Sequence, residues 1–282
     1  MRLMPLREAL AAHVADGDCV ALEGFTHLIP FAAGHELIRQ GRRNLHLVRM
    51  TPDLIYDQLI GMGCAKRLTF SWGGNPGIGS LHRLRDAVEH GWPRPLELDE
   101  HSHAGMAAAF CAGAARLPFG MLRGYLDNDL DKVNPRIGRI ECPFTGERLA
   151  AVPAINPDVT ILHAQCADRE GNVAIQGIIG AQREAALAAG ALVVTVEEIV
   201  DQLAPAMNGI VLPHWTVDAV VHCPGGAYPS YAHGHYSRDN SFYQRWDAIS
   251  RDRDGFNDWM RAHVLETNDH AGFLASLRAE AA

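Results

Sequence analysis

Apolar residues follow two patterns that alternate along the first half of the chain, short continuous runs and stretches with helical spacing. The short runs predict strands at residues 19–22, 45–50, 67–72 and 96–100. The spaced stretches predict helices at residues 6–14, 31–40, 81–90 and 104–115, with another beginning after residue 53. Strands that alternate with helices predict an α/β fold, with an open, mostly parallel sheet and helices on both faces.

The second half repeats this pattern after a less regular middle. Residues 137–141 and 149–155 are predicted to form an antiparallel pair of strands. Further strands are expected at residues 159–164, 173–175, 192–196, 210–212 and 217–222, with a helix at 181–189. With no low-complexity linker and no internal repeat, we interpret residues 1–282 as one domain, the alternative being a boundary near 115–150.

Several polar residues mark the expected ends of helices. Asp53, after Thr51-Pro52, carries a capping signal for the helix that follows, and Ser80 is expected to cap the helix at 81–90. Gly41 suits the position just after the helix at 31–40. The last sixty residues hold aromatic residues among charges and end in a mixed helix. Their aromatic segment, residues 228–243, is interpreted as a lid or as a surface that packs against a partner.

Composition narrows the class of protein. Apolar residues make up 48% and charged residues 21% of the chain, which is typical of a soluble globular protein. A net charge of −8 argues against nucleic acid or an anionic membrane as the main partner, without excluding a ligand that carries phosphate. No apolar run has the length of a membrane span, and we expect no signal peptide. Six scattered cysteines without a CxxC pair favour a reducing cytoplasm.

Four groups of glycine and polar residues follow the first four predicted strands. Successive parallel strands joined by right-handed crossovers place their carboxyl ends at one edge of the sheet, where such folds bind ligands. The groups are Glu23-Gly24-Phe25-Thr26-His27, Met50-Thr51-Pro52, Trp72-Gly73-Gly74-Asn75 and Glu100-His101-Ser102-His103. Each alone is typical of an ordinary turn or helix cap, whereas the four together predict a ligand site. Gly24 would let the backbone approach that ligand, because it has no Cβ.

Other chemistries find less support in these groups. His101 and His103 could bind a metal, but no third ligand lies at a recognisable spacing, so no metal is predicted. No GxSxG elbow of a serine hydrolase is present. The glycine-rich stretch at residues 73–79 matches neither GxGxxG nor a P-loop, and it lacks the lysine of the latter. It is interpreted as a flexible loop that approaches a substrate.

The stretch at residues 16–30 resembles a signature of the α subunits of family I CoA-transferases, of the glutaconate and 3-oxoacid CoA-transferase type. The matching residues are Asp16-Gly17, Val20-Ala21-Leu22, Gly24-Phe25 and Pro30. Glu23 departs from the pattern, since the family has a glycine there. The stretches at residues 100–119, 168–173 and 224–229 add to the resemblance, which spans essentially the whole chain. It implies the fold shared by NagB, RpiA and the CoA-transferases.

The resemblance also implies a mechanism and a partner. A glutamate of a homologous β subunit would attack an acyl-CoA thioester, and CoA would pass through a glutamyl-CoA thioester to a free 3-oxo acid or dicarboxylate. This chain lacks the Ser-Glu-Asn-Gly-type motif of that glutamate, so a β subunit is required, in an α2β2 or larger assembly. CoA is then a substrate, and no cofactor is expected. The N–H groups around Gly24–Thr26 would stabilise the oxyanion.

The implied site therefore consists of glycine-turn and loop residues with one candidate acid. The candidates for binding substrate or CoA are Gly24, Phe25, Thr26, His27, Gly73, Gly74, Asn75, His101 and Ser102. A distant branch of the family hydrolyses or opens rings of CoA thioesters with a glutamate on its α chain. Glu100 occupies a comparable strand end, so a hydrolase with Glu100 as acid or base is an alternative. A third interpretation is a regulatory subunit that only binds CoA esters.

Overall fold

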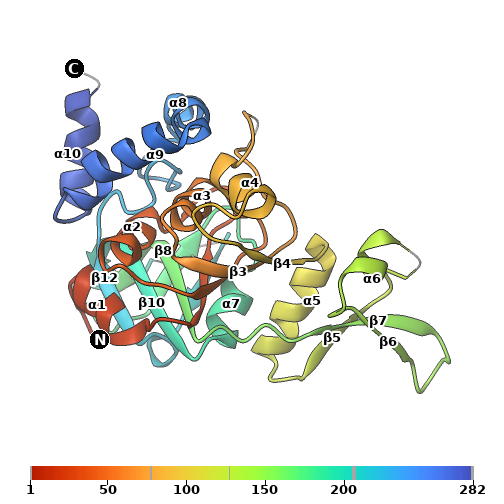
Figure 1. Cartoon of the computed structure of the whole chain (residues 1–282). Helices are drawn as coiled ribbons and strands as arrows, with labels where there is room; N and C mark the ends of the chain where they lie inside the picture. Colours follow the sequence, from red (N-terminus) through yellow and green to blue (C-terminus); the bar gives the residue numbers. More distant parts are fainter. Residues whose placement is uncertain (1, 77, 127, 205–207, 281–282) are drawn as a thin grey trace.

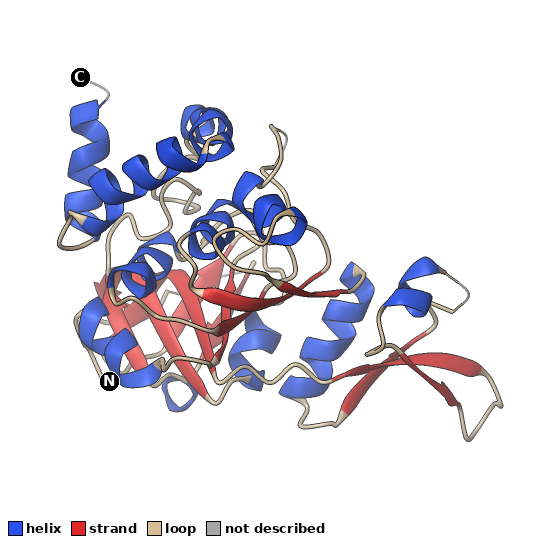
Figure 2. Cartoon of the chain, viewed as in Figure 1, coloured by secondary structure: helices blue, strands red, loops and turns tan. Residues whose placement is uncertain are grey.

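The computed structural model describes residues 2–76, 78–126, 128–204 and 208–280, and a nine-stranded sheet forms its centre (Figures 1 and 2). The parallel strands lie in the order β4 (Glu97–Glu100), β3 (Ala65–Phe70), β2 (Leu45–Val48), β1 (Cys19–Glu23), β8 (Val159–Asp168), β10 (Ala191–Val200) and β12 (Ala219–His222). Two antiparallel strands, β9 (Val173–Gln176) and β11 (Gly209–Leu212), complete the sheet. The predicted α/β class with a mostly parallel sheet is confirmed.

Helices cover both faces of this sheet (Figure 2). The elements on one side are α1 (Leu6–His13), α2 (Phe31–Arg39), α3 (Leu54–Gly61) and α4 (His82–Glu89), and those on the other are α5 (His103–Ala114) and α7 (Gln182–Ala188). The apolar residues of strand β1 face both layers of helices. Val20 and Leu22 pack in the core beneath α1 to α4, while Ala21 points to the opposite side and packs with α5 and α7.

Strands β8 and β10 are longer than the apolar runs predict, ten residues each against the expected 159–164 and 192–196. Residues 159–162 of β8 pair with β1, whereas Cys166 and Ala167 pair with β9. The antiparallel pair of β9 and β11 thus continues the sheet beyond the carboxyl end of β1. Polar residues such as His163 and Glu197 belong to these strands because β10 pairs with β8 over its whole length.

The irregular middle of the chain forms a separate three-stranded antiparallel sheet, at the right of Figure 1. Its strands are β5 (Phe119–Leu122), β7 (Arg148–Pro153) and β6 (Gly138–Glu141), in that order, with the short helix α6 (Asp129–Val133) beside them. The predicted antiparallel pair is therefore confirmed as β6 and β7. Tyr125, Ile137 and Val152 form a small core with Ala109 of α5, which attaches this sheet to the rest of the chain.

The expected mixed helix at the C-terminus is wrong, because the segment is broken into several helices. They are α8 (Asn240–Arg251), α9 (Arg253–Met260), the π-helical turn η2 (Arg261–Leu265) and α10 (His270–Glu280), after the 3₁₀ turn η1 (His214–Thr216). Aspartates start new helices here, since the carboxylates of Asp239 and Asp252 accept hydrogen bonds from Phe242 N and Gly255 N. Tyr243 is buried in the main core, so the aromatic segment packs largely within the chain.

Two predicted caps also need correction. The cap position of α4 is Leu81, and the first-turn N–H groups of Arg83 and Leu84 donate instead to Asp57 Oδ1 of α3, at 2.8 and 2.9 Å, so Ser80 does not have the expected role. Asp53 does occupy the cap position of α3, but its carboxylate does not cap the helix in the described part of the chain. It forms an ion pair with Arg49 instead, at 2.9 Å between Oδ1 and Nη1. A buried guanidinium is a stronger partner for a carboxylate than a backbone N–H group.

Candidate functional site at the carboxyl ends of the strands

The four groups that follow the first four strands lie along one edge of the sheet, as predicted from their sequence. Strands β1, β2, β3 and β4 are neighbours and parallel. Hydrogen bonds connect one group to the next. Met50 N donates to Glu23 Oε1 at 3.0 Å, Ser71 Oγ donates to Met50 O at 2.7 Å, and the same Oγ lies 3.2 Å from His103 Nδ1. The edge is therefore a connected set of loops rather than four independent turns.

Gly24 occupies a turn that folds back on itself. A Cβ at this position would lie 2.7 Å from the carbonyl oxygen of Leu28 and 2.9 Å from that of His27, closer than real Cβ atoms approach. Thr26 and Leu28 have φ angles of 62° and 53°, in the left-handed region that β-branched and bulky residues seldom adopt. The glycine is thus required by close packing of backbone against backbone. We name residues 24–28 the glycine turn.

The glycine turn presents two main-chain donors. Among the residues that the structure describes, no acceptor takes a hydrogen bond from the backbone N–H of Phe25 or Thr26. Both residues are half-buried. Gly24 N–H makes only a long contact of 3.3 Å with Glu23 Oε2. Successive free N–H groups in a tight turn make a concave site for negative charge, so this geometry suits the oxyanion role that the resemblance implies.

Glu23 stands inside the fold, beneath the glycine turn. Its side chain is 1% exposed, and it accepts hydrogen bonds from Met50 N and, more weakly, Gly24 N. Burial raises the pKa of Glu23 to about 7, against the opposing charge of Arg49 and the two N–H groups. Arg49 donates from Nη2 to Gly24 O at 2.6 Å and from Nη1 to Asp53. Glu23 and Arg49 therefore support the turn from behind.

His27 also faces inward. It is fully buried, with Nε2 2.9 Å from Gln176 O and its ring 4.8 Å from that of Tyr231. Burial lowers the pKa of His27, which favours a neutral ring. Leu28 N donates to Tyr231 O at 2.9 Å. His27 thus joins the glycine turn to β9 and to the segment after β12, and it does not lie at the open side of the turn.

The loop after β3 divides into an open and a closed part. Gly73 is exposed, whereas Gly74 is buried against the ring of Trp72. Asn75 is 2% exposed and donates from Nδ2 to Tyr243 O at 2.8 Å, which fastens the loop to α8. Of the three predicted residues here, Gly73 is the one that lies open to solvent. Residue 77 of the glycine-rich stretch lies outside the described residues.

The residues that follow β4 differ in exposure and in hydrogen-bond partners. Glu100 is exposed, and its backbone oxygen accepts a hydrogen bond from Asn134. His101 is buried and pairs with Asp99, 3.1 Å from Nε2 to Oδ1, and both line a cavity of about 290 Å³ under the linker to β8. Burial raises the pKa of Asp99, but hydrogen bonds and nearby positive charges outweigh it and lower the pKa. Ser102 caps α5 by accepting from Gly105 N.

His101 and His103 have different partners, Asp99 and Ser71, and do not converge on one point. Among the described residues, no three histidine, cysteine or acidic side chains are grouped so as to hold a metal ion. Similarly, none of the described helices is long and apolar enough to cross a bilayer.

Sequence reasoning missed two buried groups of polar residues. Arg49 could not be placed from spacing, because Glu23 comes near it only when β1 and β2 pair, although its other partner, Asp53, is only four residues away in the sequence. The second group surrounds Glu197 of β10. Its Oε1 lies 2.6 Å from His163 Nε2 and accepts from Tyr236 OH at 2.6 Å, while Oε2 accepts from Gly225 N at 2.7 Å. Polar residues inside the predicted apolar strands were the available signal.

Comparison with known proteins identifies the family. Residues 3–223 match the profile of the coenzyme A transferase family. The chain is 64% identical to the α chain of 3-oxoadipate CoA-transferase from Pseudomonas knackmussii, with 98% of each chain covered. The crystal structure of glutaconate coenzyme A-transferase from Acidaminococcus fermentans superposes with a TM-score of 0.91 at 32% identity, covering 99% of this chain and 94% of that one.

A second solved structure has the same fold and a different activity in its name. The decarboxylase AibA/AibB superposes with a TM-score of 0.80 at 32% identity and covers 92% of this chain and 98% of its own. The profile match covers most of this chain, and the two CoA-transferase relatives cover nearly all of it. The chain belongs to the coenzyme A transferase family.

Proposed function

We propose that this chain is the α subunit of a heteromeric CoA-transferase that moves CoA between an acyl-CoA thioester and a 3-oxo dicarboxylic acid, 3-oxoadipate being the first candidate. The substrate follows the name of the relative that is 64% identical over nearly the full length. The observation that carries the role of this chain is the glycine turn, where Phe25 and Thr26 present N–H groups without an acceptor among the described residues.

The glutamate nucleophile belongs to the partner chain in this proposal. Glu23 is 1% exposed beneath the glycine turn, so its carboxylate does not reach a thioester on the open side. Glu100 is exposed on β4, the strand at the margin of the sheet. Neither is a carboxylate held in a cleft at the free N–H groups. A partner chain that closes over this edge would bring the missing group.

The reaction then proceeds by two acyl exchanges. The partner's glutamate attacks the thioester carbonyl, and CoA leaves as thiolate, which yields an acyl-glutamyl anhydride. The thiolate attacks the glutamyl carbonyl, which releases the donor acid and leaves a glutamyl-CoA thioester, and the acceptor carboxylate reverses these steps. Each attack develops an oxyanion. The N–H groups of Phe25 and Thr26 are placed to donate to it, Gly24 allows the tight turn that presents them, and the exposed Gly73 leaves room for the thioester.

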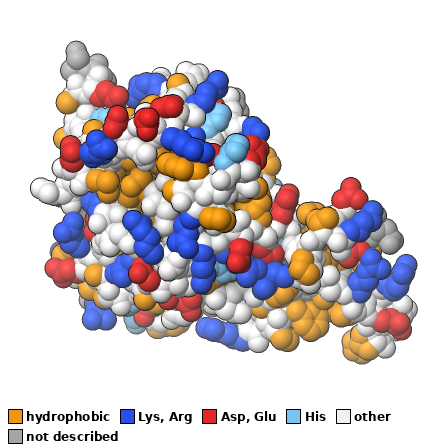
Figure 3. Space-filling view, in the orientation of Figure 1, with side chains coloured by type: hydrophobic (Ala, Val, Ile, Leu, Met, Phe, Trp, Pro, Cys, Tyr) orange, Lys and Arg blue, Asp and Glu red, His pale blue; other side chains and the backbone are white. Residues whose placement is uncertain are grey.

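Exposed apolar side chains support the need for a partner. Figure 3 shows hydrophobic side chains gathered over the second sheet. Met121, Val133 and Phe144 in this part of the chain are 58%, 72% and 93% exposed. Several large apolar side chains this exposed in one part of a chain favour a protein contact there. We propose an α2β2 or larger assembly in the cytoplasm, with CoA as substrate and no separate cofactor.

The test compares the chain alone with the chain co-expressed with a homologous β subunit. Each preparation is assayed for CoA transfer to 3-oxoadipate, with succinyl-CoA and acetyl-CoA as donors. We expect activity only in the complex, and a covalent CoA adduct on a glutamate of the β subunit by mass spectrometry. Full activity of the isolated chain, or an adduct on this chain, would contradict the assignment of the nucleophile.

A further inference from the structure

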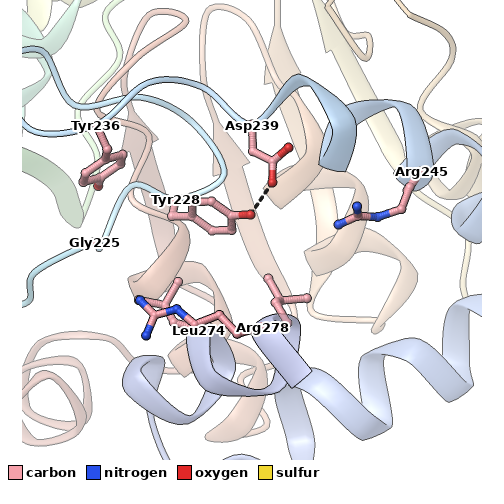
Figure 4. A pocket seen from close by; sticks show the side chains of 8 residues that line it. Gly225, Tyr228, Tyr236, Asp239, Arg245, Leu274 and Arg278 are labelled. Atoms are coloured by element: carbon pink, nitrogen blue, oxygen red, sulfur yellow. Dashed lines mark hydrogen bonds between the residues drawn. The ribbon is translucent and has the colours of Figure 1, made fainter. Parts of the chain in front are cut away.

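A second cavity lies away from the strand edge, between the C-terminal helices and the segment after β12 (Figure 4). It has a volume of about 380 Å³, within the usual range for small-molecule sites. Its lining comes from three parts of the chain, namely residues 225–239, helix α8 and helix α10. The lining residues are Gly225, Tyr228, Tyr236, Asp239, Arg245, Leu274, Leu277 and Arg278.

Two exposed arginines line this cavity, and neither pairs with an acid among the described residues. Arg245 comes from α8 and Arg278 from α10, on different sides of the Tyr228 ring (Figure 4). Neither makes a hydrogen bond or ion pair with any residue that the structure describes; Arg245 only lies 6.0 Å from the centre of the Phe242 ring. Both charges act on Tyr228, whose pKa is raised by burial and by Asp239 and is opposed by the two guanidinium groups.

The acid in the cavity is already engaged. Asp239 Oδ2 accepts from Tyr228 OH, and Oδ1 accepts from Phe242 N at 2.8 Å to cap α8. Tyr236 is likewise occupied, since its hydroxyl donates to Glu197. The cavity thus combines two available cations with an apolar wall formed by Leu274 and Leu277. Such a lining suits a ligand with one anionic end and an apolar body.

We propose that this cavity binds a small organic anion, a carboxylate on a short apolar chain, between Arg245 and Arg278. The carboxylate accepts hydrogen bonds from the guanidinium groups, and the chain packs on Leu274, Leu277 and the Tyr228 ring. The site is distinct from the glycine turn and does not depend on the proposed reaction. Free carboxylic acids are substrates and products of CoA transfer, so a ligand of this class would be present wherever the proposed reaction takes place.

The segment that lines the cavity also supports the glycine turn. Ser230 Oγ donates to Thr26 O at 3.3 Å, and Tyr231 O accepts from Leu28 N at 2.9 Å. Tyr228 and Tyr236, which lie on either side of these residues in the sequence, both line the cavity. An anion bound between the two arginines therefore contacts the same segment that fixes the turn from behind.

The probe for this site is hexanoate, titrated by calorimetry into the full-length protein in the assembled form in which it purifies. Hexanamide has the same apolar chain without the charge, and inorganic phosphate has charge without the chain. We expect saturable binding of hexanoate and at least about tenfold weaker binding of the other two. Hexanamide lacks the charge that strengthens hydrogen bonds with the guanidinium groups, and phosphate lacks the chain that packs on Leu274 and Leu277.

Variants locate the binding. Arg245→Gln and Arg278→Gln should each weaken hexanoate binding about tenfold or more, while Arg261→Gln, an exposed arginine paired with Asp258, should leave it unchanged. The two pocket arginines make no ion pair among the described residues, so equal melting temperatures would show that folding is intact. Hexanoate binding that survives in the double variant, or no saturable binding by the unaltered protein, would overturn the proposal. The binding proposal does not depend on whether the complex catalyses CoA transfer, so absence of that activity would not count against it.

Discussion

Two buried glutamates lie on strands β1 and β10, on either side of β8, and their pKa values shift in opposite directions. Glu23 ends β1 and is held by two backbone N–H groups, and burial raises its pKa to about 7. Burial also raises the pKa of Glu197 in β10, but His163, Tyr236 and Gly225 N outweigh it and lower the pKa to about 2. Both side chains are buried, so the difference between their pKa values comes from the number and strength of the hydrogen bonds and charges that stabilise each carboxylate.

The difference in pKa corresponds to different roles of the two glutamates. Glu197 joins β8, β10 and the segment after β12, and its ionised form is matched by its surroundings. Glu23 lies under a turn whose N–H groups at Phe25 and Thr26 donate neither to its carboxylate nor to any other acceptor among the described residues. We infer that the Glu197 region is arranged for stability and the Glu23 region for binding.

The largest effect should come from Gly24→Ala, which tests the functional side of the comparison. The new Cβ would lie 2.7 Å from Leu28 O, so the turn must change conformation, and its N–H groups would no longer point at the oxyanion. We expect kcat of the complex to fall about 10²–10³-fold, as for loss of an oxyanion donor. The control is Gly138→Ala, where a Cβ meets nothing closer than 3.7 Å. A fall of less than about threefold in Gly24→Ala would exclude the turn from the reaction.

Glu197→Gln tests the structural side. The amide replaces one oxygen by an NH₂ group, which then faces His163 and Tyr236 or the N–H of Gly225, all groups that now donate or lie within hydrogen-bond distance. We expect the free energy of unfolding, measured in urea, to fall by roughly 2–4 kcal/mol. Glu198→Gln, at a neighbouring side chain that is 62% exposed, should change it by less than about 0.5 kcal/mol. Equal effects of the two substitutions would remove the contrast.

The pH dependence of stability should differ in sign at the two glutamates. The pKa of Glu23 is about 7 in the folded chain against 4.5 in the unfolded one, so the folded state binds more protons between these values. Stability from this group is therefore highest below pH 4.5 and falls by about 3 kcal/mol as pH rises to about 7. For Glu197 the pKa is lowered, so its contribution is present above pH 4.5 and is lost as pH falls toward about 2.

The substitution Glu23→Gln removes the titrating carboxyl group and so isolates the contribution of Glu23 to the pH dependence of stability. The difference in unfolding free energy between the variant and the unaltered chain should grow in favour of the variant from pH 4.5 to 7. At low pH the two should agree within about 1 kcal/mol, since only the weak bond to Gly24 N need be lost. Unfolding curves over this pH range make the measurement. A constant difference across it would mean that Glu23 is ionised at low pH, as Glu197 is.

The sequence was sufficient for the sheet and for the location of the edge, because both depend on local patterns. Alternating apolar runs and helical spacing placed β1 to β4, and right-handed crossovers then set their direction. The meeting of Glu23 with Arg49 could not be predicted, since it needs the register of β1 against β2. In the same way, His163 and Glu197 come together only through the pairing of β8 with β10.

Roles within the predicted site were harder to assign than its position. Gly24 follows from a turn pattern, but burial separates the open Phe25 and Thr26 from the closed His27, and burial is decided by the distant Tyr231 and Gln176. The burial of Asn75 could not be predicted for the same reason, because its hydrogen-bond partner Tyr243 lies far away in the sequence, in α8. Side chains next to each other in the sequence alternate between inside and outside according to contacts that no local pattern contains.

Glu100→Gln should have the smallest effect and completes the comparison with a third, exposed carboxylate at a strand end. Glu100 accepts no hydrogen bond at its side chain from the described residues, and solvent stabilises its charge. We expect less than about threefold change in CoA transfer by the complex, with Glu97→Gln on the same strand as the control. Thioester hydrolysis is measured in parallel. If the Glu100 variant alone abolishes turnover, this carboxylate acts as acid or base, and the hydrolase interpretation replaces transfer by the partner's glutamate.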